Sequence, residues 1–222
     1  MGGKAITHEK DIEYFKEYPA PIMEHIHKLH HTNVNSTITF FGPMLYFMLR
    51  GLCSEKVLEI GHAEGYTAHY LAHAVKDTGI RFGVLESCMY YGVDIVQTEK
   101  VREALTAQEL PNTIINLDSA LLTPDTFKGV TFDVIFQDGA HDTEHVLYEF
   151  DTMWPQLRAD GKGYWIMHDI QGPAEEGYKI IRDKIMNRKI DAEFVALDCI
   201  YGLAIIRKID NFDYAKRNWT DV

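Results

Sequence analysis

The stretch from residue 57 to 67, VLEIGHAEGYT, constrains the fold of this chain more than any other. Its apolar residues predict a buried strand, and Gly61 and Gly65 predict a tight turn before a helix that opens at Tyr66 and Thr67. The free N–H groups of such a helix favour a ligand in the turn. The G-x-x-x-G spacing differs from the G-x-G-x-x-G of dinucleotide binders. We expect a ligand-binding turn; the alternative is an ordinary turn whose glycines serve packing.

A carboxylate stands near the end of this apolar strand. Glu59 comes two residues before the first glycine of the turn. Its burial would cost free energy unless it meets a cation or hydrogen-bond donors. An amino group on the ligand would satisfy it, so Glu59 is a candidate binding residue.

From residue 56 onward, segments that read as strands alternate with amphipathic helices. Strands are predicted at 56–60, 80–85, 113–117, 132–137 and 163–167, and helices at 66–76, 92–108, 143–157 and 174–187. Two further strands, 194–197 and 203–207, have no helix between them, which predicts a closing antiparallel hairpin. The pattern predicts an α/β fold with a doubly wound, mostly parallel sheet, and ligands at the carboxyl ends of its strands.

The chain before the first strand reads as helical, with short helices at 11–18 and 22–29 and an apolar helix at 40–52. A length of 222 residues suits one domain. We expect a single domain with a helical N-terminal lid or flank (1–52), a ligand-binding core (53–208) and a C-terminal tail (209–222). The apolar N-terminal helices could also form the surface of a homodimer.

Composition excludes several classes of partner. Lys+Arg 22 against Asp+Glu 33 gives a net charge of −11, without a basic run, which disfavours nucleic acid. Three scattered cysteines without C-x-x-C spacing indicate a reducing compartment. Neither a signal core nor an apolar run of membrane-spanning length is visible, so no membrane association is predicted. We expect a cytoplasmic protein.

Five consecutive predicted strands place acidic or histidine side chains at the same edge of the sheet. These are Glu59, Glu86, Asp118 with Ser119, Asp138 with His141, and His168 with Asp169. Glu86 follows the turn by about twenty residues, where an acid accepts hydrogen bonds from both ribose hydroxyls. Acids beyond strands also cap helices, as expected for Asp142, and the alternative for Asp118 is that it simply starts a turn. Taken together, the five strand ends favour a ligand site.

These motifs, in their order, resemble the motif series of a known enzyme family. The segments VLEIGHAEGYTAHYLA, VLES, LDSA, FDVIFQDGAH and YWIMHD are similar to those of class I S-adenosylmethionine-dependent methyltransferases, over about residues 40–208. The match is closest to small-molecule O-methyltransferases of the catechol and caffeoyl-CoA type and to macrocin-type enzymes. The resemblance implies a Rossmann-like, seven-stranded sheet with a reversed last strand, S-adenosylmethionine as cofactor and a small-molecule acceptor.

The resemblance also implies which residues at the strand ends bind each part of the cofactor. In that family the glycine turn holds the methionine part, and the matching residues here are Gly61, Ala63, Gly65, Tyr66 and Thr67. Glu59 would then lie near the methionine ammonium group, Glu86 at the ribose, Asp118 and Ser119 beside the adenine, and Asp138 against the cofactor.

In the catechol-type family a divalent cation lowers the pKa of the acceptor oxygens. Its ligands are an aspartate after strand four and an Asp-Asn pair after strand five; Asp138 and Asp169 match the two aspartates, and His141 falls at the position of the family's lysine base. Ile170 replaces the asparagine, so His168, water or substrate would complete the shell of Mg²⁺ or another divalent cation. We take His141 and Asp169 as the catalytic residues. Under the alternative without metal, Asp138 contacts the cofactor and Asp169 is a structural cap.

The prediction is therefore a methyltransferase that moves a methyl group from S-adenosylmethionine to a small-molecule acceptor, with oxygen as the expected acceptor atom. The alternative is a cofactor- or nucleoside-binding protein of the same fold without methyl transfer, because the Asp-Asn pair is lost. A nicotinamide-dependent oxidoreductase is disfavoured by the glycine spacing.

Overall fold

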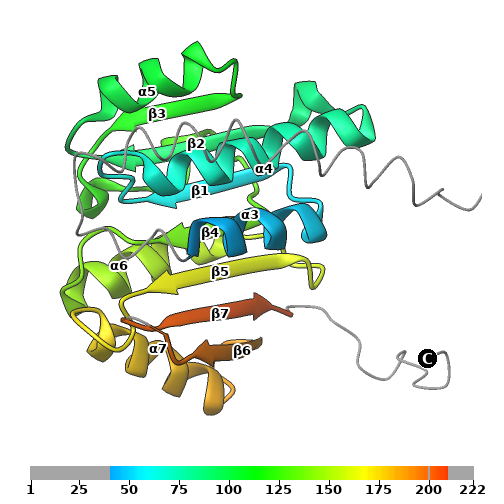
Figure 1. Ribbon diagram of the computed structural model, residues 1–222. Helices are drawn as coiled ribbons and strands as arrows, with labels where there is room; N and C mark the ends of the chain where they lie inside the picture. The colour runs from blue at the N-terminus through cyan, green and yellow to red at the C-terminus, as the bar shows by residue number, and fades with distance from the viewer. Residues whose placement is uncertain (1–40, 200, 210–222) are drawn as a thin grey trace, which may run out of the picture.

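A single seven-stranded sheet forms the centre of the computed structural model, which describes residues 41–199 and 201–209 (Figure 1). The strand order is β3-β2-β1-β4-β5-β7-β6, from top to bottom of the figure. The strands are β1 (Lys56–Ile60), β2 (Met89–Asp94), β3 (Asn112–Asn116), β4 (Val134–Gln137), β5 (Gly163–His168), β6 (Ala192–Leu197) and β7 (Leu203–Lys208). The first five run parallel, whereas β7 pairs antiparallel with both β5 and β6. The predicted doubly wound sheet with a reversed last strand is confirmed.

Helices cover both faces of this sheet, because its side chains alternate between two hydrophobic clusters. Val57 of β1 belongs to one cluster, and Leu58 and Ile60 belong to the other. The first cluster lies beneath α3 (Phe41–Leu52), α4 (Tyr66–Phe82) and α5 (Thr98–Ala107), and the second beneath α6 (Thr143–Met153) and α7 (Glu175–Met186). Short 3₁₀ turns complete the chain: η2 (Leu85–Ser87), η3 (Ser119–Leu121), η4 (Pro124–Phe127) and η5 (Trp154–Gln156). Both faces of the parallel strands are thus buried, as in other doubly wound sheets.

The predicted position of the second strand is wrong. Residues 80–82 belong to α4, which ends at Gly83 with φ +70°, where the backbone N–H bonds to the carbonyls of Gly79 and Ile80. The strand itself is Met89–Asp94, and the helix predicted at 92–108 begins only at Thr98. Gly83 can adopt the left-handed conformation that closes a helix at no steric cost, so the apolar run before it continues the helix. This correction moves the carboxyl end of β2 to Asp94.

The helix predicted at 40–52 is confirmed as α3, and the closing hairpin is confirmed as β6 and β7. The two short helices predicted at 11–18 and 22–29 lie outside the described residues. Within the described part of the chain, none of the helices combines the length and the apolar character needed to cross a bilayer.

Candidate functional site

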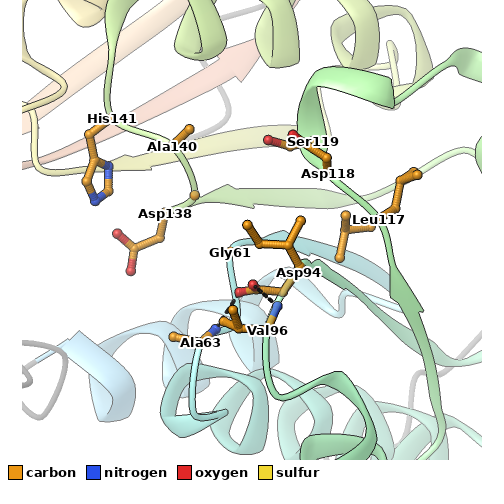
Figure 2. Close-up of a pocket in the computed structure, with 13 residues that line it drawn as sticks. Gly61, Ala63, Asp94, Val96, Leu117, Asp118, Ser119, Asp138, Ala140 and His141 are labelled. Atoms are coloured by element: carbon orange, nitrogen blue, oxygen red, sulfur yellow. Dashed lines mark hydrogen bonds between the residues drawn. The ribbon is translucent and has the colours of Figure 1, made fainter.

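A pocket lies at the carboxyl ends of β1, β2, β3 and β4. The chain proceeds from β1 toward β3 on one side and from β4 toward β5 on the other, so β1 and β4 flank the switch point where open α/β sheets bind ligands. The pocket has a volume of about 450 Å³ (Figure 2). Its wall is formed by the ends of these strands and the loops after them: Gly61, Ala63, Val93, Asp94, Ile95, Val96, Leu117, Asp118, Ser119, Asp138, Gly139, Ala140 and His141.

The glycine turn after β1 forms one wall of the pocket. Gly61 has φ +87°, and its N–H bonds to the carbonyl of Val93 at 2.9 Å. A Cβ at Gly61 would lie 2.3 Å from the carbonyl oxygen of Asp138, so only glycine lets the β1 and β4 loops approach this closely. Gly65, with φ +85°, caps α4. Of the predicted turn residues, Gly61 and Ala63 line the pocket, whereas Tyr66 and Thr67 are buried at the start of α4.

Glu59 is buried behind the turn, with an exposed fraction of 1%. The hydroxyl of Tyr90 donates a hydrogen bond to its Oε2. Burial raises the pKa of Glu59 well above its usual value, against the opposing effect of the Tyr90 hydrogen bond. Within residues 41–199 and 201–209, Oε1 of Glu59 has no hydrogen-bond partner. The sequence predicts a ligand amino group near this carboxyl; in the structure Glu59 is not among the residues that line the pocket.

Asp94 occupies the position that was predicted from the sequence for Glu86. Its carboxylate lies at the end of β2, lines the pocket, and accepts hydrogen bonds from the backbone N–H of Ala63 at 2.8 Å and of Val96 at 2.9 Å. Glu86 is exposed and lies in η2, before β2 begins, at the opposite edge of the sheet. The error follows from the misplaced second strand. Asp94 also links the glycine turn to the β2 loop, as the dashed lines in Figure 2 show.

Asp118 and Ser119 form the far wall of the pocket (Figure 2). The Asp118 side chain accepts a hydrogen bond from the backbone N–H of Ala120 at 2.9 Å and caps η3. Asp118 therefore stands at the start of a turn, as the alternative from the sequence had it, and it also lies in the pocket wall.

Two acids and two histidines gather at the ends of β4 and β5. Nδ1 of His168 lies 2.9 Å from Oδ1 of Asp138 and 3.2 Å from Oδ1 of Asp169. Nε2 of His141 lies 3.1 Å from Oδ2 of Asp169. Asp169 adopts φ +59°, a conformation that costs a non-glycine residue energy and persists only where the surroundings enforce it. The structure thus brings all four predicted residues together.

Burial and pairing act in opposite directions on the pKa values of this cluster. Burial raises the pKa of Asp138, and the hydrogen bond from His168 opposes that rise. For His168, burial lowers the pKa, but the hydrogen bond and charge of Asp138 outweigh it, so its pKa is raised. The interaction of His168 with Asp138 thus favours the protonated imidazole, with its Nδ1–H directed at the Asp138 carboxylate.

The cluster also fits a divalent cation. Asp138, His141 and Asp169 each offer a ligand atom, and these three atoms lie within 4.8 Å of one another. From the sequence, His168 was the expected third ligand; the set that the geometry selects contains His141 in its place. Ile170 is buried and offers no donor atom. Two carboxylates and one imidazole are a common donor set for first-row divalent ions.

Sequence reasoning missed one acid next to the pocket. Glu149 of α6 has an exposed fraction of 0%, and its Oε2 accepts a hydrogen bond from Nε2 of Gln137 at 2.6 Å. Burial raises the pKa of Glu149 to about 7. A signal was present: Glu149 follows Val146 by three residues and lies on the same apolar helix face as Phe150 and Met153.

Part of the chain matches a known protein family. Residues 58–170, which make up half of the chain, match the family described as a methyltransferase domain. A search of curated proteins finds no match.

Solved structures share the fold at low sequence identity. The SAH-bound methyltransferase PaMTH1 of Podospora anserina is 16% identical, with a TM-score of 0.64, over 95% of this chain and 100% of that one. An O-methyltransferase from Bacillus cereus in complex with SAH is 15% identical, with a TM-score of 0.62, over 88% and 96%. A putative caffeoyl-CoA O-methyltransferase from Staphylococcus aureus is 14% identical, with a TM-score of 0.62, over 90% and 97%.

Proposed function

This chain belongs to the family of methyltransferase domains, and from that premise we propose that it transfers a methyl group from S-adenosylmethionine to an oxygen atom of a small-molecule acceptor. One observation carries the proposal. The pocket of about 450 Å³ at the switch point is continuous from the Gly61 turn and Asp94 to Asp138 and His141. A single cavity therefore offers both a place for a nucleoside and a basic group beside it.

The protein itself needs to do little covalent chemistry in this reaction. The cofactor supplies a methyl group on a positively charged sulfonium, so the chain has to align the acceptor and remove its proton. In our proposal, Asp94 accepts hydrogen bonds from the ribose hydroxyls, and Ser119 lies beside the base. His141 takes the proton of the acceptor hydroxyl, while the oxygen forms its bond to the methyl carbon and the carbon–sulfur bond breaks. Nε2 of His141 faces Oδ2 of Asp169 at 3.1 Å, so in our proposal Nδ1 is the nitrogen that receives this proton.

Asp138, His141 and Asp169 are the residues that would hold a divalent cation. Such an ion would lower the pKa of the acceptor oxygens, so the base would remove the acceptor proton more easily. The imidazole ligand favours Mn²⁺ or another first-row ion over Mg²⁺, which prefers oxygen atoms alone. Nε2 of His141 either binds the cation or remains paired with the carboxylate of Asp169, and metal titration distinguishes these roles.

Calorimetric titration of the metal-stripped protein with S-adenosylhomocysteine tests the cofactor. We expect micromolar binding that weakens by about tenfold to a hundredfold in Asp94→Ala, because hydrogen bonds to a charged group are lost. Asp94→Asn keeps the shape of the side chain, so a loss of binding in this variant cannot be attributed simply to misfolding of the turn. Glu86→Ala is the matched control and should bind as the wild type does. Absence of binding with and without added Mg²⁺ or Mn²⁺ would refute the proposal.

The catalytic step is tested by His141→Ala against His145→Ala, a partly exposed histidine in the first turn of α6, four residues further along the chain. With a panel of catechols and phenols as acceptors, we expect His141→Ala to lose roughly 100-fold or more in turnover while it keeps its affinity for S-adenosylhomocysteine. His145→Ala should retain activity. Equal turnover in the two variants would contradict the role of His141 as the base. Cofactor binding without methyl transfer to any acceptor would favour a cofactor-binding protein of the same fold.

A further inference from the structure

His168 stands between the two carboxylates at the ends of β4 and β5. Its Nδ1 forms a hydrogen bond of 2.9 Å with Oδ1 of Asp138. An ionised carboxylate only accepts, so Nδ1 carries the hydrogen and donates it. The same nitrogen lies 3.2 Å from Oδ1 of Asp169. One imidazole N–H thus engages one oxygen of Asp138 and faces one oxygen of Asp169.

The ring of His168 is held in one orientation. His168 is the last residue of β5, which pairs with β4 on one side and with β7 on the other, where Leu203 is its partner. The side chain is buried, and the ring of Phe41 of α3 contacts it edge-on, with 5.3 Å between the ring centroids. Nε2 is enclosed and has no hydrogen-bond partner in the described part of the chain. Rotation of the ring would therefore break the bond to Asp138 and form none in its place.

Asp138 is fixed except at one oxygen. Its backbone N–H donates to the carbonyl of Ile60 at 2.9 Å, and its Oδ1 accepts from His168. Oδ2 accepts no hydrogen bond from any residue that the structure describes, and Asp138 lines the pocket. Figure 2 shows its carboxylate near the ring of His141, with which it shares the candidate cation site. Asp138 therefore offers a ligand in the pocket one oxygen that is not already engaged.

We propose that His168 is a positioning residue that sets the cation preference of the site: by holding Oδ1 of Asp138, it leaves this acid one oxygen for a cation and so favours Mn²⁺ over Ca²⁺. This inference rests on the proposed function, because it takes Asp138, His141 and Asp169 as the residues that would hold the ion. From the sequence, His168 was expected to be a ligand itself. In the structure its Nδ1 is engaged with Asp138 and its Nε2 is enclosed, so neither nitrogen is left for the ion.

The two cations differ in what they require from a carboxylate. Ca²⁺ takes about six to eight oxygen ligands and binds carboxylates through one or both oxygens, whereas Mn²⁺ suits an octahedron of about six ligands. Asp138 can give both of its oxygens to an ion only if it loses the hydrogen bond from His168. Removal of that bond should therefore help Ca²⁺ more than Mn²⁺.

Competition between the two ions measures this preference. Mn²⁺ binding to the full chain, with S-adenosylhomocysteine present, is followed by the electron paramagnetic resonance signal of the free ion, and Ca²⁺ binding by its displacement of Mn²⁺. In His168→Ala we expect the ratio of Mn²⁺ affinity to Ca²⁺ affinity to fall by about tenfold to a hundredfold, the usual effect of losing a residue that orients a metal ligand. Charge lost with the imidazole acts on both divalent ions alike and cancels in this ratio.

Three further variants separate positioning from a general structural role. The amide N–H of His168→Asn stands as many bonds from the backbone as Nδ1 does, so this variant should donate to Asp138 and restore most of the wild-type ratio. Phe41→Leu removes the ring contact but no donor, and it should lower the ratio by a smaller factor. His145→Ala removes a histidine that pairs with Asp142 at 2.6 Å outside the cluster, so it is the matched control and should keep the wild-type ratio.

The proposal is overturned if His168→Ala has the wild-type ratio, or if His168→Asn does not restore it. Complete loss of Mn²⁺ binding in His168→Asn would make His168 a ligand and would also overturn it. If His168→Ala does not fold, Phe41→Leu decides, and an unchanged ratio there counts against the proposal. Cofactor binding without binding of either cation would refute this inference alone, whereas no binding of S-adenosylhomocysteine would refute the proposed function.

Discussion

Replacement of Gly61 by alanine tests the idea that the pocket depends on close contact between the β1 and β4 loops. Two costs are expected. Alanine at φ +87° loses about 1–2 kcal/mol, because its Cβ approaches the backbone carbonyl oxygen. The new Cβ would also lie 2.3 Å from the carbonyl oxygen of Asp138 and 2.4 Å from Cα of Gly139. These are backbone atoms of the neighbouring loop and cannot turn aside, so we add about 1–3 kcal/mol for overpacking.

Gly129→Ala carries only the first of these two costs, so the difference between the two variants measures the second. Gly129 has φ +76°, and apart from its chain neighbours no atom of the described residues lies within 4 Å of the place that a Cβ would take there, so this variant should lose only the conformational part, about 1–2 kcal/mol. Urea unfolding measures both variants, and S-adenosylhomocysteine titration measures the pocket. An excess of about 1–3 kcal/mol for Gly61→Ala corresponds to a further drop in Tm of roughly 2–12 °C for a protein of this size. Cofactor affinity should fall in Gly61→Ala alone.

Equal losses of stability in the two variants would refute this reasoning. They would mean that the loops separate freely and that the contact between Gly61 and Asp138 does not shape the pocket. Normal cofactor affinity in Gly61→Ala would have the same meaning for function.

Two further predictions concern the buried acids. Tyr90→Phe removes the hydroxyl that donates to Glu59, so we expect a loss of about 1–3 kcal/mol in the free energy of unfolding, measured in urea; an unchanged midpoint would contradict this. The pKa of Glu149 is raised by burial from 4.5 to about 7, so the folded chain holds more protons than the unfolded one between these values. Stability should therefore decline as the pH rises from about 4.5 to 7, by roughly 3 kcal/mol in total. Thermal unfolding at pH 5 and pH 8 should show a smaller decline in Glu149→Gln, and an equal decline in both proteins would refute the assignment.

Strand β1, its glycine turn and the alternation of strands with helices follow from local patterns. Leu58 and Ile60 are apolar in a run that must be buried, and Gly61 stands where the chain must leave the sheet with positive φ. Asp138 and Asp169 could likewise be expected together, because the ends of neighbouring parallel strands meet at one edge. These inferences need only the periodicity of the chain and the topology that it implies.

The second strand shows where this reasoning fails. The segment 80–85 is apolar enough for a strand, and nothing local distinguishes it from the end of a helix that Gly83 closes. One misplaced boundary moved the candidate ribose acid from Asp94 to Glu86. Pairing of β2 with both β1 and β3 decides the register, and that pairing depends on residues distant in sequence.

The sequence by itself determined the α/β architecture, the turn at Gly61 and the acids and histidines at the ends of β4 and β5, because hydrophobic period and glycine position are local properties. Only the tertiary structure decided that Asp94 faces the pocket, that His141 pairs with Asp169, and that Glu149 is buried against Gln137. Each of these depends on the distance between segments far apart in the chain. Packing, which fixes those distances and excludes water from the groups between them, sets the charges and hydrogen bonds of the site.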